Sequence, residues 1–244
     1  MKVRARFAKQ GKVRFTSHRD LARMWERALR RAELPLAYTQ GFSPRPKLHF
    51  GLALPTGAES EAEYLDIDVA EPADGGPAEL DPATLPARLT PCLPEGITVT
   101  AAAIVDTGVM SLQQAVTSCT WRITVADTTA QDAAVAVERA LAADQLVITR
   151  ERKGKSVTDD LRPLICALAV LGETPDGVEL EAELATQPRS VRPSELLSAL
   201  DPPLTERRVC RIHQWVALDG ARTEPLLLGS AVAPPAAHAE VRAS

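Results

Sequence analysis

The chain has 244 residues, of which 45% are apolar, 25% charged and 4% aromatic. This composition is typical of a folded globular protein with aliphatic cores, and it excludes a disordered or fibrous chain. The longest strongly apolar run, residues 164–171, is too short to cross a bilayer, so we expect no membrane contact. The sequence begins with alternating charged residues instead of a signal peptide, and this favours a cytoplasmic location.

The net charge of -4 is unevenly distributed along the chain. Residues 1–50 hold thirteen Lys and Arg against three acidic residues, a net charge of +10, whereas residues 51–244 carry -14. A basic block in an acidic protein is the pattern expected of a surface that meets polyanions, although a solvated basic face would give the same count. The four cysteines are far apart and show no metal-binding spacing, so we expect neither a metal nor another cofactor.

In chain order, the first part alternates strand and helix patterns. Residues 1–15 alternate apolar and charged side chains with a turn at 10–12, which predicts a half-buried strand. Ser17 followed by Asp20 predicts the start of a helix that ends before Pro35. The further elements expected in this part are strands at 36–39, 48–54 and 63–69, a weak helix at 81–92 and a strand at 97–105.

The second part repeats this order of elements without repeating the sequence. A short helix at 111–116 is expected to link the two parts. The elements then expected are strands at 120–125, 146–150, 164–171 and 178–186, helices at 129–143 and 193–200, and a last strand at 209–218. We therefore predict an α+β fold of two tandem ferredoxin-like (βαββαβ) halves with antiparallel sheets. The expected domains are residues 1–106 and 107–219, followed by a flexible tail at 220–244.

The helix at 17–32 is the first candidate binding element. Its apolar residues fall on one stripe at three- and four-residue spacing, which predicts packing against the sheet. Four arginines lie on the opposite side: Arg19, Arg23, Arg27 and Arg30. Each guanidinium is a planar, permanently charged fork, so the row suits a chain of phosphates. The alternative is an ordinary solvated helix face.

The loop at 40–47 is the second candidate. Phe42 stands between Gly41 and Ser43, with Arg45, Lys47 and His49 close behind it. An exposed aromatic ring among cations suits single-stranded RNA, because a base stacks on the ring and the cations hold the backbone. Equally, Phe42 could fold back under the loop as a hydrophobic plug.

Two further groups of residues carry possible chemistry. His18 could act as acid or base in a metal-free ribonuclease reaction, but packing at a strand–helix corner or contact with a phosphate is the commoner role. Asp66 and Asp68 alternate on one strand and therefore share a face, where they could hold a metal ion. They could equally form a solvated face or pair with Arg45 and Lys47.

The second part has its own cationic loop. Residues 150–155 predict a basic hairpin turn that contains Lys153 and Lys155. Arg207, Arg208 and Arg211 on the last strand are expected to add to its positive charge. The loop could line the same groove as the first helix.

Three stretches of the chain resemble a bacterial family of unknown function. They read VRFTSHRDL at 13–21, YTQGFSPRP at 38–46 and DLRP at 160–163. Together they are similar to the radical-SAM-linked proteins, the DUF2344 group, over about residues 1–220. Members of that family stand alone or are fused to a cobalamin-binding radical-SAM protein. The resemblance therefore implies a radical-SAM partner in modifying some substrate.

The same resemblance implies a link to RNA, since standalone relatives tend to be encoded near ribonuclease E/G and ribosomal-protein genes. The chain lacks the C-x-x-x-C-x-x-C run that holds a radical-SAM cluster, so it cannot perform that chemistry alone. More loosely, two ferredoxin-like halves with a His near the first helix look like RNA-processing endoribonucleases of the RAMP superfamily, which is analogy only.

The leading hypothesis is a non-catalytic protein that binds tRNA or rRNA and presents it to a radical-SAM modifying enzyme. One alternative is a metal-independent endoribonuclease that uses His18 or His49. The other is a protein–protein adaptor whose basic block docks an acidic partner such as ribonuclease E/G.

Overall fold

The computed structural model describes residues 1–70, 80–152, 154–218 and 220–228. Within these ranges, nine strands form one sheet and two further strands form a separate hairpin. Most strand pairs are antiparallel. The α+β class predicted from the sequence is confirmed.

The first half of the sheet has the order β4-β1-β3-β2, with each neighbouring pair antiparallel. Its elements are β1 (Lys2–Lys9), α1 (His18–Arg31), β2 (Leu48–Phe50), β3 (Glu59–Asp68), α2 (Leu85–Leu89) and β4 (Ile97–Val105). The short helix α3 (Leu112–Ala115) leads from β4 into the second half.

The second half has the order β10-β5-β9-β8, again with antiparallel neighbours. Its elements are β5 (Val116–Ala126), α4 (Ala130–Ala142), β6 (Val147–Arg152), β7 (Lys155–Asp160), β8 (Ile165–Thr174), β9 (Gly177–Ala185), α5 (Pro193–Ala199) and β10 (Thr205–Leu218). β6 and β7 pair with each other outside the main sheet.

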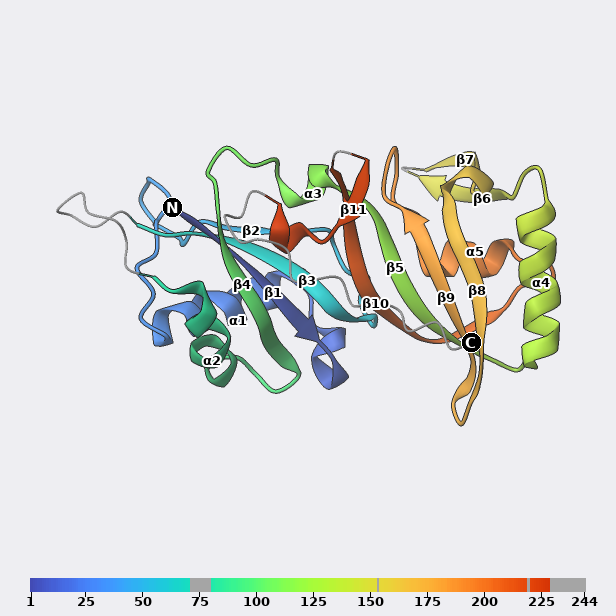
Figure 1. Ribbon diagram of the computed structural model, residues 1–244, viewed down its shortest axis with the longest axis horizontal. Coiled ribbons are helices and arrows are strands. Elements are labelled where there is room, and N and C mark those ends of the chain that lie inside the picture. The colour runs from blue at the N-terminus through green and yellow to red at the C-terminus, as the bar shows by residue number, and fades with distance from the viewer. Residues whose placement is uncertain (71–79, 153, 219, 229–244) are drawn as a thin grey trace, which may run out of the picture.

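The two halves are joined edge to edge. β3 and β10 pair in parallel, with Glu59 opposite Cys210 and Ser60 opposite Arg211. Figure 1 shows the resulting sheet along the length of the molecule, with α1 and α2 at one end and α4 and α5 at the other. A single sheet therefore carries both halves.

Each half has its own apolar core between sheet and helices. In the first half, Phe7 of β1 meets Trp25 of α1 edge to face, with ring centroids 5.0 Å apart, and both are fully buried. In the second, Trp121 and Ile123 of β5 pack with Leu196 of α5. Apolar burial of this kind holds α1 in place and fixes which of its faces is turned outward.

Several predicted elements are shorter than expected. β1 ends at Lys9 and residues Gly11–Phe15 form a 3-10 turn, since Gly11 takes a left-handed φ of 68° and its amide donates to the Glu59 carboxylate (2.8 Å). The strand expected at 36–39 forms only isolated bridges. The helix expected at 81–92 shrinks to α2 between 3-10 turns, because Pro82, Pro86 and Pro91 lack amide donors.

The second half differs in its central insertion. The strand expected at 146–150 does not join the main sheet but forms the β6–β7 hairpin. The segment expected as a tail begins with β11 (Ala221–Thr223), which pairs with β10, and a 3-10 turn at Pro225–Leu227. Residues 229–244 lie outside the described ranges. The boundary expected at residue 106 falls between β4 and α3, and the division into two domains stays a prediction.

Candidate nucleic-acid interface

Helix α1 begins as the sequence predicts. The Ser17 side chain accepts a hydrogen bond from the Asp20 amide (3.2 Å) and donates one to the Asp20 carboxylate (2.8 Å), which caps the helix. The buried side chains of α1 form the expected stripe: Leu21, Trp25, Ala28 and Leu29. Since this stripe faces the sheet, the arginine row is turned outward.

All four arginines of the row are exposed: Arg19, Arg23, Arg27 and Arg30. Arg23 forms one ion pair, 3.5 Å from Asp20 on the same helix, with both side chains about half exposed. Such a surface pair contributes little stability and opens readily. Within the part of the chain that the structure describes, the other three have no acidic side chain within ion-pair distance. The row thus presents charge that the fold itself leaves available.

Other cations of the basic block are used internally. Arg4 is fully buried and donates to both oxygens of Asp66 (2.7 and 2.9 Å) and to the Pro225 carbonyl (2.8 Å). Arg14 contacts Glu59 at 3.2 Å, and burial lowers the pKa of Lys9 despite the nearby Glu63 charge. Lys2 and Arg6 lie near Asp68 and Glu224, at 3.9 and 3.8 Å. The basic residues of the first fifty positions therefore do not form one continuous positive surface.

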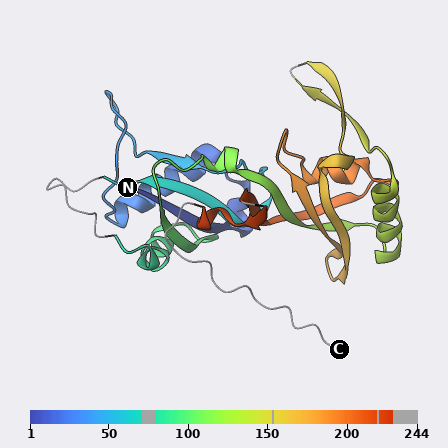
Figure 2. The same ribbon diagram turned by 45° about the horizontal axis from the view of Figure 1, so that its top comes forward.

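The loop after α1 is a hairpin that carries Phe42 at its tip. The amide of Thr39 donates to the Arg45 carbonyl, and that of Lys47 to the Ala37 carbonyl, both at 2.9 Å. Phe42 is 105% exposed, so the hydrophobic-plug interpretation is wrong. Arg45, Lys47 and His49 are also exposed. Figure 2 shows this hairpin and the β6–β7 hairpin projecting from the same side of the molecule.

His18 and His49 line one cavity of about 520 Å³ together with Lys2. The His18 ring is edge-on to Phe50, with centroids 4.9 Å apart, so it packs at the strand–helix corner. His49 is 3.5 Å from Asp68. The structure therefore brings together the two histidines that the sequence suggested for acid–base work.

The Asp66 carboxylate pairs with Arg4, and not with Arg45 or Lys47. Both of its carboxylate oxygens accept from Arg4, and Asp68 lies near Lys2 and His49. Within the described ranges, no three His, Cys, Asp or Glu side chains are grouped closely enough to bind a metal.

The cationic loop of the second half is partly neutralised. Arg150 pairs with Asp159 at 2.7 Å. Arg207, Arg208 and Arg211 were expected to add charge, but they contact Asp176, Glu59 and Glu63 at 3.5, 2.6 and 2.6 Å. Lys153 lies outside the described residues, as does the side chain of Lys155.

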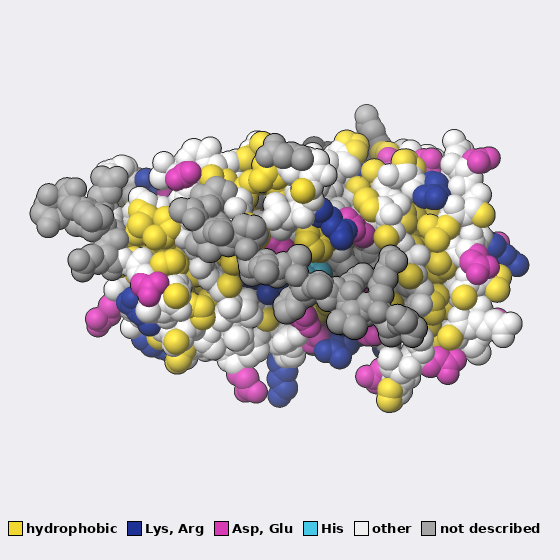
Figure 3. All heavy atoms as spheres, in the orientation of Figure 1, with side chains coloured by type: hydrophobic (Ala, Val, Ile, Leu, Met, Phe, Trp, Pro, Cys, Tyr) yellow, Lys and Arg dark blue, Asp and Glu magenta, His cyan; other side chains and the backbone are white. Residues whose placement is uncertain are grey.

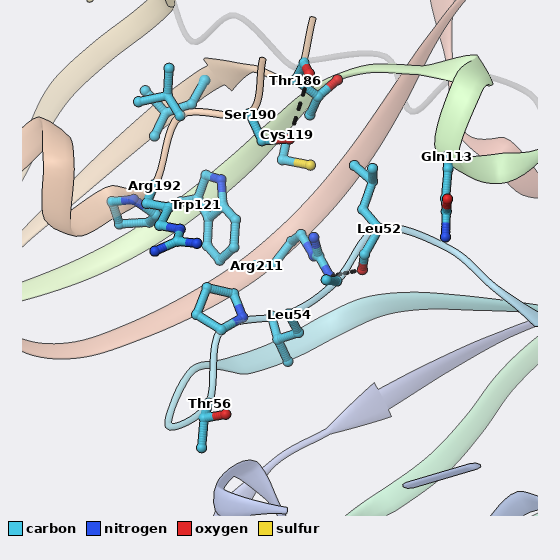
Figure 4. Close-up of a pocket in the computed structure, with 15 residues that line it drawn as sticks. Leu52, Leu54, Thr56, Gln113, Cys119, Trp121, Thr186, Ser190, Arg192 and Arg211 are labelled. Atoms are coloured by element: carbon cyan, nitrogen blue, oxygen red, sulfur yellow. Dashed lines mark hydrogen bonds between the residues drawn. The ribbon is translucent and has the colours of Figure 1, made fainter. Parts of the chain in front are cut away.

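A second cavity, of about 770 Å³, lies between the two halves and was not foreseen from the sequence. Its floor includes Arg211, whose guanidinium donates to Glu63 (3.0 and 2.6 Å) and to the Leu52 carbonyl (3.0 Å). Figure 4 shows Trp121 and Arg192 on one side and Leu52 and Leu54 on the other. Its residues come from distant parts of the chain, and no local motif marks them.

The molecule is not uniformly basic. On the face shown in Figure 3, Lys and Arg side chains are interspersed with Asp and Glu. This mixing agrees with the ion pairs of Arg122 with Glu179 and Glu181. In the described ranges the longest helix is α1, with 14 residues, and no helix there is an apolar span of bilayer length.

The chain belongs to a bacterial protein family. Residues 2–193 match the family described as an uncharacterized protein conserved in bacteria (DUF2344). The match covers both candidate hairpins and α1 and ends at the first residue of α5. This confirms the family predicted from the three sequence stretches. Comparison with curated proteins gave no match.

Proposed function

We propose that this protein binds RNA through α1 and the 37–47 hairpin and presents it to a radical-SAM modifying enzyme. The observation that carries the proposal is that the arginine row of α1 stays exposed although Arg4, Arg14 and Lys9 are drawn into the fold. At a helical rise of 1.5 Å per residue, Arg19 and Arg30 are about 16 Å apart along the axis. The row is thus long enough to meet several phosphates.

The hairpin complements this row with a different kind of contact. Phe42 offers an aromatic face that no part of the described structure covers, and Arg45 and Lys47 stand beside it on the same hairpin. Stacking on aromatic rings is how proteins commonly hold unpaired RNA bases. We therefore infer a single-stranded segment, such as a loop of tRNA or rRNA, as the bound form.

We also infer that each half is a ferredoxin-like unit. The strand orders β4-β1-β3-β2 and β10-β5-β9-β8 support this, because each is the order of a βαββαβ unit once the β6–β7 hairpin is set aside. A tandem of such units is the basis of the likeness to RAMP proteins, which by itself carries no activity.

Reversing two charges of the row tests RNA binding. In the variant Arg23→Glu/Arg30→Glu, we expect affinity for a tRNA mixture to fall at least a hundredfold, since two attractive contacts with phosphate become repulsive. The measurement is a filter-binding titration at fixed salt. The matched control Arg139→Glu/Arg207→Glu makes the same change in net charge at exposed arginines of the second half and should retain most of the affinity.

Equal affinities for the two double variants would refute the proposed interface, because only overall charge would then matter. Pull-down with and without nuclease separates RNA binding from an adaptor role. A radical-SAM protein or ribonuclease E/G retained after nuclease treatment would favour the adaptor, whereas loss of the partner after nuclease would favour RNA as the bridge.

A second candidate function is a metal-independent endoribonuclease, favoured by the common cavity of His18 and His49. Acid–base cleavage of RNA needs two such groups within reach of one phosphate. Incubation with RNA in EDTA tests this candidate. Cleavage that is lost in His18→Ala would support it, and intact RNA with the parent protein would exclude it.

A further inference from the structure

We propose that the cavity between the two halves binds one nucleotide, with the base between apolar side chains of both halves and the phosphate at Arg192. The nucleotide is either a free mononucleotide or an unpaired residue of a bound RNA; only the second source rests on the proposed function. The shared chemistry is a flat heteroaromatic ring joined to an anion.

The cavity has the size and walls of a small-molecule site. Its volume of about 770 Å³ falls within the range of roughly 300–1,000 Å³ typical of ligand pockets. The loop between β2 and β3 contributes Leu52, Leu54 and Pro55. On the other side, Val191 lies just before α5 and Pro193 is the first residue of that helix. A ligand here would contact both halves, since Figure 4 shows lining side chains of both halves around the cavity.

The floor of the cavity is fixed and electrically balanced. Arg211 is fully buried, and its charge is compensated by Glu63, to which two of its nitrogens donate. Its third hydrogen bond holds the Leu52 carbonyl, so the loop that forms one wall is tied to β10. Burial raises the pKa of the Cys119 thiol to about 11, so this lining residue stays neutral and unreactive. The described residues of the floor therefore offer no unpaired charge to a ligand.

Arg192 supplies the charge that the floor lacks. It is exposed at the rim, directly before α5. The neighbouring Glu195 carboxylate is already engaged by the Arg192 amide (2.9 Å) and by the Arg189 guanidinium (3.0 Å). Among the described residues, the Arg192 guanidinium has no acidic partner. An unpaired cation at the rim of a cavity favours a ligand with an anionic end.

Polar side chains in the lining favour a base over an aliphatic tail. Gln113 is exposed and lines the cavity; its amide nitrogen donates to the Phe50 carbonyl (3.5 Å), and its amide oxygen can accept from a ligand. Thr186 donates its hydroxyl hydrogen to the Val116 carbonyl (2.6 Å), which leaves its oxygen as an acceptor. Such groups suit the hydrogen-bonding edge of a nucleobase and would be left unsatisfied by a fatty chain.

Two binding measurements on the full chain test the proposal. The first is calorimetric titration with AMP, GMP, CMP and UMP. We expect at least one to bind, with affinity reduced tenfold or more in Arg192→Ala and in Leu54→Trp, which fills the cavity, and unchanged in Arg139→Ala. The second is the fluorescence of a short oligoadenylate with a central 2-aminopurine, which should change on binding to the parent and not to Leu54→Trp.

Each outcome decides the proposal separately from RNA binding. Mononucleotide binding that Arg192→Ala weakens supports a free nucleotide as ligand. A 2-aminopurine signal that depends on Leu54, without mononucleotide binding, supports a residue of the RNA. If no mononucleotide binds and the signal is the same in the parent, Arg192→Ala and Leu54→Trp, the proposal is wrong even where the α1 row still binds RNA. Circular dichroism checks that each variant is folded. If Leu54→Trp does not fold, Arg192→Ala still tests the proposal, because Arg192 is exposed and its loss should not disturb the fold.

Discussion

The cations of the first fifty residues divide according to the position of their acidic partners. Arg4 donates to Asp66, which is 62 positions away in the sequence. Arg14 and Arg208 both donate to Glu59, and Arg208 is 149 positions away from Glu59. Charge counting could not foresee these pairs, because it takes no account of distant strands that become neighbours. The row on α1 was predictable, since its exposure follows from helical periodicity alone.

Glu59 offers a test of these internal pairs. Its carboxylate is buried and accepts hydrogen bonds from Arg208 (2.9 and 2.6 Å), the Gly11 amide (2.8 Å) and Arg14 (3.2 Å). Burial alone would raise the pKa of Glu59, but these bonds and the Arg208 charge outweigh it and lower the pKa. The resulting stability is present above the unfolded-state pKa of about 4.3 and is lost as the pH falls through the lower pKa of the folded state.

We expect Glu59→Gln to lower the free energy of unfolding at neutral pH by about 2–4 kcal/mol, because Arg208 and Arg14 lose their counter-charge. The difference from the parent should shrink as the pH falls below about 4. Urea denaturation across this pH range measures both effects. Glu61→Gln, at an exposed neighbouring position, is the control. Equal stability of parent and Glu59→Gln at neutral pH would contradict this account.

At the scale of elements, strong local signals gave accurate predictions. The helix expected at 17–32 is α1 at His18–Arg31, because Ser17 caps it and its apolar period is regular. The strand at 97–105 was predicted with its observed bounds. Weak signals failed where tertiary contacts determine the structure. The alternation of apolar and charged residues continues to Val13 and predicted a continuing strand, yet the chain leaves β1 at a turn that begins at Gly11. The β6–β7 hairpin has strand-like sequence but no place in the main sheet.

The 37–47 hairpin leads to a prediction about Phe42. Because its ring is fully exposed, Phe42→Ala should leave the stability unchanged. Affinity for single-stranded RNA should fall by about tenfold to a hundredfold, as expected from the loss of one base stack of about 1–3 kcal/mol. Phe42→Trp should bind as tightly as the parent. Fluorescence anisotropy with a labelled oligonucleotide measures this, and undiminished binding by Phe42→Ala would remove the stacking role.

At the scale of the whole molecule, the sequence indicated the order of the elements but not the junction between β3 and β10. No local pattern indicates that β3 would pair with β10, since the contacts that fix this pairing join residues about 150 positions apart. Two ion pairs, Glu59–Arg208 and Glu63–Arg211, also cross the junction, and both of their carboxylates are buried. The cavity between the halves was missed for the same reason.

Because of this junction, we expect both halves to unfold in one cooperative transition. Trp25 lies in the first core and Trp121 in the second, so each reports on its own half. In the variant Trp121→Phe/Trp215→Phe only Trp25 remains, and in Trp25→Phe/Trp215→Phe only Trp121 remains. Urea unfolding of each variant is followed by tryptophan fluorescence and by circular dichroism. In each variant the two signals should have the same midpoint. Separate transitions in either variant would show that the halves are independent.

The most direct test of the account is the salt dependence of RNA binding. With Arg19, Arg23, Arg27, Arg30, Arg45 and Lys47 on phosphates, the slope of log K against log salt concentration should be about -4 for a single strand. Arg27→Ala should make this slope less steep by about 0.7, whereas Arg139→Ala, on the exposed face of α4, should leave it unchanged. A slope for Arg27→Ala equal to that of the parent would show that the α1 row does not contact phosphates.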